Sequence, residues 1–291
     1  MDNKNVSFQL NKLPKKTFGI TAVIPFSEIK KTEESILEDQ GKLVEIKGFR
    51  KGMAPQNMVK DVLGKEKLTR FILEKILPKL FQKAVEEFKL KPILSPKVEL
   101  VSAEEGKDWQ VKFLSCEEPE INLGGYKEEI KKAASASAKI WTPGDQKEEK
   151  PQDKENEREK KVNTALEWLL NNLKVEISGL LIEDEVNRKL SSLIDQTQKL
   201  GLTVEQYLAS SGKKIETIRE EYAKQSRENL IFEFILGKIA DEEKISVTEE
   251  DLNKATQKAQ TETEKKALEN QKYYLAVLIR RQKTLDFLAN L

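Results

Sequence analysis

The chain has 291 residues, of which 35% are charged, yet its formal net charge is only +1 and it contains no histidine. Interspersed charges of both signs exclude a single-sign surface suited to wrapping nucleic acid. The lack of histidine excludes Ser-His and Cys-His nucleophilic sites and every histidine-ligated metal. No Gly-rich phosphate loop is present either, so the sequence predicts no catalytic residue, metal or cofactor.

The length favours two domains, each large enough to bury a core. One cysteine, Cys116, allows no internal disulfide and favours a reducing, cytoplasmic location. We expect Cys116 to be a small buried side chain, because no base accompanies it in sequence. No apolar run approaches the roughly 18 residues of a membrane span, so no membrane association is expected.

The first 120 residues carry the pattern of an α+β domain with a four-stranded antiparallel sheet. Alternating apolar residues predict its strands, which are a hairpin over residues 5–24 and the two segments 97–101 and 109–114. A helix is predicted from Ser27 to about Gly41. A longer helix, bent at Pro78, is predicted over residues 56–90, where apolar residues recur at steps of four.

From Gly124 the composition changes, and 12 of the 16 residues from Gln146 to Lys161 are charged. Such a stretch cannot bury enough apolar area to fold alone, which indicates a charged linker or a solvated helical arm over residues 124–161. The rest of the chain is helical, with cap signals at Gly201, Thr203, Gly212 and a capping box formed by Thr248 and Asp251. The expected organisation is an α+β domain over 1–123, that linker or arm, and an all-α domain over 162–291.

The segment Gly48-Phe49-Arg50-Lys51-Gly52-Met53-Ala54-Pro55 lies between two predicted helices. Its glycines permit a tight reversal, Phe49 offers contact area at low entropic cost, and the two cations offer phosphate or carboxylate contacts. Residues 42–60 hold five cations and only Glu45 as an anion, so this loop is locally basic. We predict a docking tip; the alternative is that Phe49 packs into its own domain and the cations are merely solvated.

In this setting the loop resembles the ribosome-binding motif of the bacterial trigger factors. The resemblance extends through most of the chain, in segments that lie at residues 92–96, 118–126, 185–188, 201–208 and 245–248. The loop motif is specific in its position between the helices, whereas the helical matches are looser.

The resemblance implies a chaperone at the polypeptide tunnel exit of the large ribosomal subunit. Such a protein touches a tunnel-exit protein and adjacent rRNA, and it shields unfolded nascent polypeptides in a cradle of extended helical arms without ATP. Carried over by motif, the ribosome contacts are Phe49, Arg50 and Lys51, with Gly48 and Gly52 shaping the turn. Whether the chain also forms a homodimer is left undecided by the sequence.

The sequence departs from the family pattern at three places. Met53 stands where a basic residue is usual, which removes one charge contact from the loop. Ser178 stands where a proline is usual. Only about 35 polar residues separate Tyr126 from Val162, where trigger factors usually carry an FKBP-like prolyl isomerase domain. Such a domain needs a sheet and an aromatic pocket, so no isomerase activity is predicted.

Several apolar residues of the C-terminal helices are candidate client contacts, namely Ile231, Phe234, Tyr273 and Tyr274. Most apolar positions there must form the core, because helical arms need packing to persist. An alternative to the ribosome-docked chaperone is a ribosome-independent helical holdase or assembly module, which would tolerate replacement of the loop.

Overall fold

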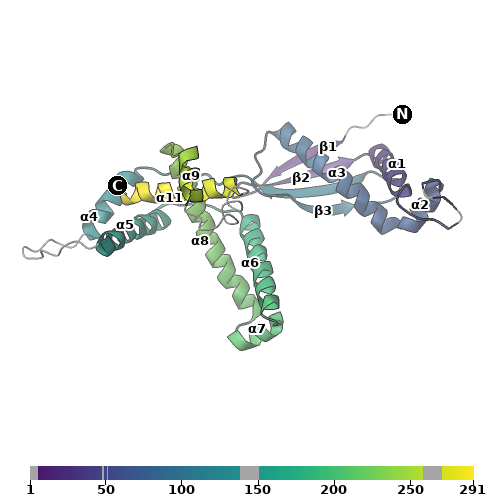
Figure 1. Cartoon of the computed structure of the whole chain (residues 1–291). Helices are drawn as coiled ribbons and strands as arrows, with labels where there is room; N and C mark the ends of the chain where they lie inside the picture. Colours follow the sequence, from purple (N-terminus) through teal and green to yellow (C-terminus); the bar gives the residue numbers. More distant parts are fainter. Residues whose placement is uncertain (1–5, 48, 51, 138–150, 258–270) are drawn as a thin grey trace, which may run out of the picture. The chain divides into compact units, whose positions relative to one another are not determined.

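The computed structural model describes the chain in stretches, which are residues 6–47, 49–50, 52–137, 151–257 and 271–291. The chain forms two compact units (Figure 1). The first unit contains the chain up to Glu118 together with Ser178–Leu181, and the second contains Pro119–Ile177 and Ile182–Leu291. The predicted domain limits at 123 and 161 stay predictions, and each unit is described below by itself.

A four-stranded antiparallel sheet organises the first unit, as the alternation of apolar residues predicts. Its strands are β1 (Ser7–Lys12), β2 (Thr17–Ile24), β3 (Lys97–Ser102) and β4 (Trp109–Cys116), in the spatial order β1-β2-β4-β3. Ile20 of β2 lies opposite both Leu10 of β1 and Phe113 of β4. Because Ile20 and Phe113 are fully buried, this row is part of the core.

Three helices share this core with the sheet, namely α1 (Phe26–Gly41), α2 (Gln56–Leu63), which packs against the other two, and α3 (Lys65–Phe88). The ring of Phe81 in α3 lies against Phe113, with 5.5 Å between the centroids. The prediction of one helix over 56–90 is wrong at Gly64, whose φ of +75° ends α2 and separates it from α3. The regular apolar spacing begins only at Leu68, so periodicity could not reveal the break.

The second unit is helical in all its described elements. These are α4 (Tyr126–Ser137), α5 (Pro151–Asn172), most of α6 (Gly179–Lys199), α7 (Val204–Ser211), α8 (Ile215–Glu242), α9 (Glu249–Gln257) and α11 (Lys272–Ala289). Helices α6 and α8 run side by side as an arm with α7 at its end (Figure 1), and Arg219 of α8 donates to Asn187 of α6. The predicted fold class, an α+β part and an all-α part, is confirmed.

The predicted caps shape the arm. Gly201 and Gly212 have positive φ angles of +72° and +65°. The Thr203 hydroxyl accepts from the backbone amide of Gln206 at 3.2 Å, and the Gln206 side chain accepts from the amide of Thr203 at 2.9 Å. This reciprocal capping box fixes the start of α7.

The segment expected to be a linker begins as part of the helical core. Tyr126 and Ile130 of α4 are 3% and 2% exposed, because they supply an apolar side that the high charge content of the segment conceals. The Tyr126 hydroxyl donates to the Glu243 carboxylate at 3.0 Å, and Lys127 donates to the same group at 2.7 Å. Burial, and then the Glu243 carboxylate, raise the pKa of Tyr126, which keeps the phenol protonated as a donor. Residues 138–150 lie outside the described residues.

Replacing Tyr126 by phenylalanine is expected to loosen α4, since the buried ring remains but its bond to a charged acceptor is lost. A loss of about 1 kcal/mol corresponds to roughly fivefold faster tryptic cleavage at Lys131, if cleavage follows local opening. Tyr222→Phe is the control, because no hydrogen bond of the Tyr222 hydroxyl is found among the described residues. Equal cleavage rates in the two variants would contradict this role of Tyr126.

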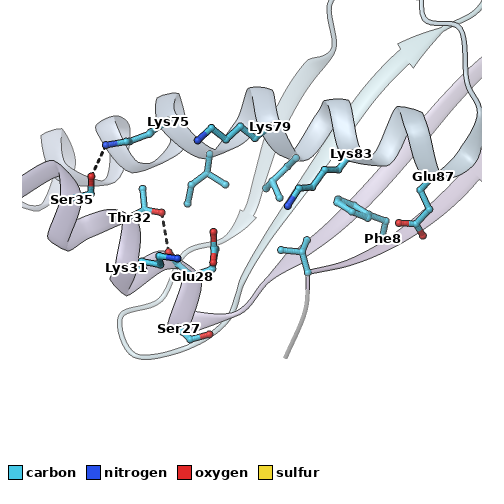
Figure 2. A pocket seen from close by; sticks show the side chains of 13 residues that line it. Phe8, Ser27, Glu28, Lys31, Thr32, Ser35, Lys75, Lys79, Lys83 and Glu87 are labelled. Carbon is cyan, nitrogen blue, oxygen red and sulfur yellow. Dashed lines mark hydrogen bonds between the residues drawn. The ribbon is translucent and has the colours of Figure 1, made fainter. Parts of the chain in front are cut away.

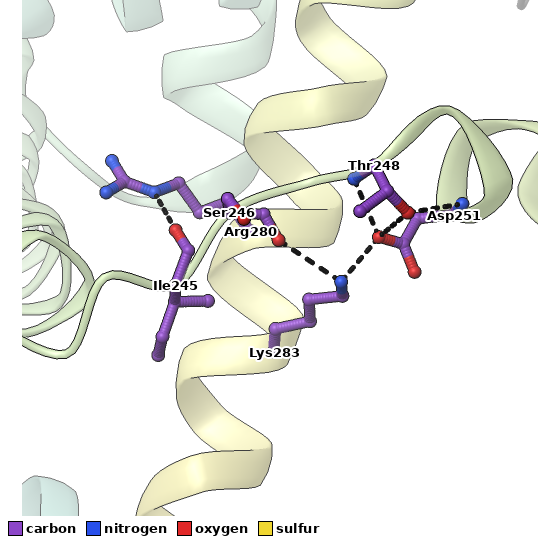
Figure 3. Close-up of polar contacts among 6 residues, drawn as sticks. All are labelled: Ile245, Ser246, Thr248, Asp251, Arg280 and Lys283. Carbon is purple, nitrogen blue, oxygen red and sulfur yellow. Dashed lines mark hydrogen bonds and ion pairs between the residues drawn. The ribbon is translucent and has the colours of Figure 1, made fainter.

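Helices α9 and α11 are joined by a cluster of polar contacts (Figure 3). The Asp251 carboxylate accepts from the backbone amide and the hydroxyl of Thr248, each at 2.8 Å, and from the Lys283 ammonium at 2.5 Å. Arg280 of α11 donates to the carbonyl of Ile245 at 2.9 Å. The predicted capping box of Thr248 and Asp251 is therefore present and also holds α11.

The Lys283 ammonium, followed by Thr248, lowers the pKa of Asp251. Since a lowered pKa means that the folded state favours the ionised carboxylate, the contact stabilises this junction at neutral pH. Its contribution is lost only as the pH falls below the ordinary titration range of aspartate, near 4.

Thr248→Ala is expected to cost about 1 kcal/mol of local stability, because the first turn of α9 loses its side-chain cap. Hydrogen exchange by mass spectrometry should then show roughly fivefold faster exchange over residues 249–257. Thr164→Ala is a suitable control, since that hydroxyl bonds only the carbonyl of Lys160 in its own helix among the described contacts. Unchanged exchange in α9 would show that the cap contributes little.

Candidate functional site

Two backbone hydrogen bonds, each between residues three apart in sequence, close the loop between α1 and α2. The amide of Phe49 donates to the carbonyl of Ile46 at 3.0 Å, and the amide of Met53 donates to that of Arg50 at 2.9 Å. Gly52 lies between them with a φ of +85°, a conformation that side chains with a Cβ rarely adopt. Two successive hydrogen-bonded turns therefore present the residues at 49 and 50, and Gly52 takes a positive φ angle as the sequence predicts. Gly48 and Lys51 lie outside the described residues.

Phe49 is 40% exposed, and Arg50 is exposed without an ion-pair partner among the described residues. Ile46 and Ala54, at either side of the loop, pack against the core of the first unit. The loop is thus anchored at both sides while its tip stays open to solvent. This arrangement disfavours the alternative in which Phe49 is fully packed into its own domain.

Further apolar side chains are exposed before the loop, within it and on α2, and sequence reasoning did not single them out as contacts. Those with large exposed fractions are Leu43 at 65%, Met53 at 73%, Met58 at 43% and Val62 at 55%. An ideal Cβ at Gly52 would lie 4.0 Å from the Cα of Lys42, so the tip folds back toward the end of α1. The exposed side chains in and beside the loop are accordingly a mixture of basic and apolar ones.

A second candidate surface lies on α11. Tyr273 and Tyr274 are 86% and 61% exposed, and Val277 and Leu278 follow one turn later with 48% and 43%. Residues at this spacing share one side of a helix, so the four side chains form an exposed stripe. We call these four residues the α11 stripe. The spacing was visible in the sequence, but exposure was not.

The other two candidate client contacts are placed differently. Ile231 and Phe234 of α8 are half-buried. Their neighbour Phe232 faces the Arg281 guanidinium of α11 at 5.7 Å. This part of α8 therefore packs toward α11 about one helical turn beyond the end of the α11 stripe. Ile231 and Phe234 are accordingly partly covered by packing.

Cys116 is fully buried at the end of β4. Burial raises the pKa of its thiol, and a contact with Ser178 only partly offsets this effect, so the thiolate is disfavoured. Ser178, which returns to the first unit, also shares a 2.8 Å hydrogen bond with the hydroxyl of Thr17. Ser178, which stands where the family usually has a proline, thus makes a buried polar contact.

Within the described stretches, no group of acidic side chains and cysteine is arranged to hold a metal ion. The helices described there include none that is long and apolar enough to cross a membrane.

The fold and the loop define a two-part class of protein, in which a small α+β domain with an exposed basic loop is joined to an all-helical domain with a long arm. Residues 6–140 match the family model described as bacterial trigger factor protein (TF), and residues 146–290 match that of its C-terminus. The chain belongs to the bacterial trigger factor family. An FKBP-like isomerase domain is not among the matched models.

Individual relatives agree with this assignment. The trigger factor of Streptococcus gordonii is 31% identical over 109 residues, which are 38% of this chain and 26% of that protein. The trigger factor of Streptococcus agalactiae is 35% identical over the same length. The matched stretch thus spans about a quarter of these curated relatives.

A solved structure from work on "promiscuous substrate recognition in folding and assembly activities of the trigger factor chaperone" has a TM-score of 0.66. It covers 97% of this chain and 99% of its own at 18% identity, a likeness that shows the fold.

Proposed function

We propose that this chain is an ATP-independent chaperone of the cytoplasm that docks at the tunnel exit of the large ribosomal subunit and shields nascent polypeptides. The observation that carries the proposal is the anchored loop whose Phe49 and Arg50 remain exposed, in a chain of the trigger factor family. Residues 1–123 provide the docking domain in this proposal, and residues 162–291 provide the client-binding domain.

Docking combines two kinds of contact. Arg50 and Lys51 supply charge-assisted hydrogen bonds to rRNA phosphates or to carboxylates of a tunnel-exit protein, and Phe49 supplies apolar area. Met53, at 73% exposure, offers apolar contact where the family usually has a charge. We therefore expect weaker and less salt-sensitive docking than a loop with a third cation would give.

Client holding rests on many weak contacts. Exposed apolar side chains such as those of the α11 stripe gain about 25 cal/mol per Å² of apolar area that a client covers, without geometry that selects one sequence. Tethering at the exit raises the effective concentration of the emerging chain, which compensates for weak intrinsic binding. The arm formed by α6 and α8 carries further exposed apolar residues, among them Leu200 and Leu202.

The proposal includes no prolyl isomerase activity, because the chain between Tyr126 and Val162 is too short and too polar for the usual domain. A peptide assay of cis/trans exchange at an Xaa-Pro bond should remain at the uncatalysed rate at high protein concentration. Acceleration that depends on protein concentration would require revision of this part.

The test is co-sedimentation of the whole chain with purified large ribosomal subunits, combined with suppression of aggregation of a chemically denatured client without ATP. Both activities are expected. Suppression of aggregation without ribosome binding would favour a ribosome-independent helical holdase, and binding without suppression would contradict the chaperone role. Sedimentation of the free chain also determines whether it forms a homodimer.

A further inference from the structure

A groove of about 730 Å³ lies in the first unit, away from the loop between α1 and α2. Helix α1, helix α3 and the beginning of β1 form its walls (Figure 2). Its apolar lining comes from Val6, which precedes β1, from Phe8 of β1, and from Ile76 and Leu80 of α3. Since β1 is an edge strand of the sheet, no further strand of the described residues pairs with its outer side.

Lysines dominate the charged lining of this groove, and they are Lys31, Lys75, Lys79 and Lys83. Lys75 is engaged, since it donates to Ser35 at 2.8 Å and to Asp39 at 3.3 Å. Lys79 and Lys83 have no ion-pair partner among the described residues, and both extend from α3 on the side of the groove (Figure 2). Within the described part of the chain only two carboxylates, Glu28 and Glu87, line the same space, so an anionic occupant is favoured.

The spacing of the α3 lysines fits an extended chain. Lys75, Lys79 and Lys83 follow at intervals of four residues, which is about 6 Å along a helix. Alternate side chains of an extended polypeptide are about 6.6 Å apart and point to the same side. Carboxylates on one side of such a segment can therefore meet successive lysines, while apolar side chains on its other side face Phe8 of β1.

The lining favours a peptide over a nucleic acid. A phosphate backbone that contacts an apolar surface loses hydration and gains no hydrogen bond there to compensate. Glu28 and Glu87 repel a continuous row of phosphates, and the described residues of the lining include no arginine to bind one bidentately. A polypeptide can instead supply both acidic and apolar side chains at the required positions.

We propose that the groove between α1, α3 and β1 binds acidic, extended segments of unfolded polypeptides in which carboxylate and apolar side chains alternate. The inference rests on the proposed function, because it assigns a class of client sequence to the first unit. It assigns to this unit a client site separate from the docking loop and from the α11 stripe.

The test is fluorescence anisotropy of a labelled peptide with alternating aspartate and leucine, titrated with the whole chain at low ionic strength. Lys79→Gln combined with Lys83→Gln should weaken binding by about three- to tenfold, the range expected for two exposed charge contacts. The charge-matched control is Lys67→Gln with Lys91→Gln, two exposed lysines of the same unit outside the groove. This control should bind the peptide as the unmodified chain does.

Three results would overturn the inference. These are equal affinities of the groove variant and its control, equal binding of a peptide with asparagine in place of aspartate, and tighter binding of an RNA oligonucleotide that depends on Lys79 and Lys83. Aggregation suppression by the unmodified chain is measured in parallel. If suppression is present but the acidic peptide does not bind, the groove assignment fails alone; if suppression is absent, the proposed function fails.

Discussion

Replacing Phe49, Arg50 and Lys51 together by alanine is expected to lower the affinity for large ribosomal subunits at least about a hundredfold, so that co-sedimentation is lost. The buried face of the loop should be unaffected, because Ile46 and Ala54 make the contacts with the core. The variant should therefore keep its fold while it loses its exposed contacts. Circular dichroism and thermal unfolding verify that requirement.

The size of this effect follows from the kind of contacts removed. Loss of an aromatic anchor at the centre of an interface commonly costs 2 kcal/mol or more, and arginine is also enriched among such positions. A total near 3 kcal/mol already corresponds to about two orders of magnitude in affinity. The charged part of this loss should diminish as salt is raised, since counterions screen exposed charges.

A matched control removes one exposed apolar side chain and two cations elsewhere in the first unit, with Leu13→Ala, Lys67→Ala and Arg70→Ala. Leu13 is 39% exposed, close to the 40% of Phe49. The control is expected to co-sediment normally. Persistent co-sedimentation of the loop variant would assign ribosome docking to another surface or favour a ribosome-independent module.

Local patterns in the sequence predicted those parts of the fold that local interactions determine. Alternation predicted the strands because successive residues of a strand face opposite sides. Cap residues such as Thr203 and Thr248 were recognised because each bonds a backbone amide three residues later. Gly64 was missed because a glycine with positive φ interrupts a helix without changing the apolar spacing that follows.

Features that depend on distant parts of the chain could not be predicted from such patterns. Ser178 returns to the first unit to contact Thr17, 161 residues earlier in the chain. The burial of Tyr126 depends on α4 packing within the helical unit and on Glu243. At the candidate sites, the motif indicated Phe49 and Arg50, but the exposed fractions of Met53 and Val277 depend on which neighbours cover them.

The α11 stripe is expected to carry a substantial part of client holding. Changing Tyr273, Tyr274, Val277 and Leu278 to serine should raise the concentration needed to suppress client aggregation by about tenfold or more. Each of these side chains gains roughly 1 kcal/mol if a client covers about 40 Å² of it, so even partial engagement of four side chains reaches this factor. Ribosome co-sedimentation should remain unchanged, because the docking loop is intact.

The control for the stripe changes four exposed apolar residues of the first unit to serine, and they are Leu13, Phe26, Ile93 and Val101, with exposed fractions of 38–52%. It removes a similar kind of surface while leaving the helical unit untouched, so it should suppress aggregation nearly as well as the unmodified chain. Equal losses in both variants would mean that total exposed apolar area, and not its position on α11, determines holding. Full activity of the stripe variant would indicate that clients are held by the arm, where Leu200 and Leu202 remain exposed.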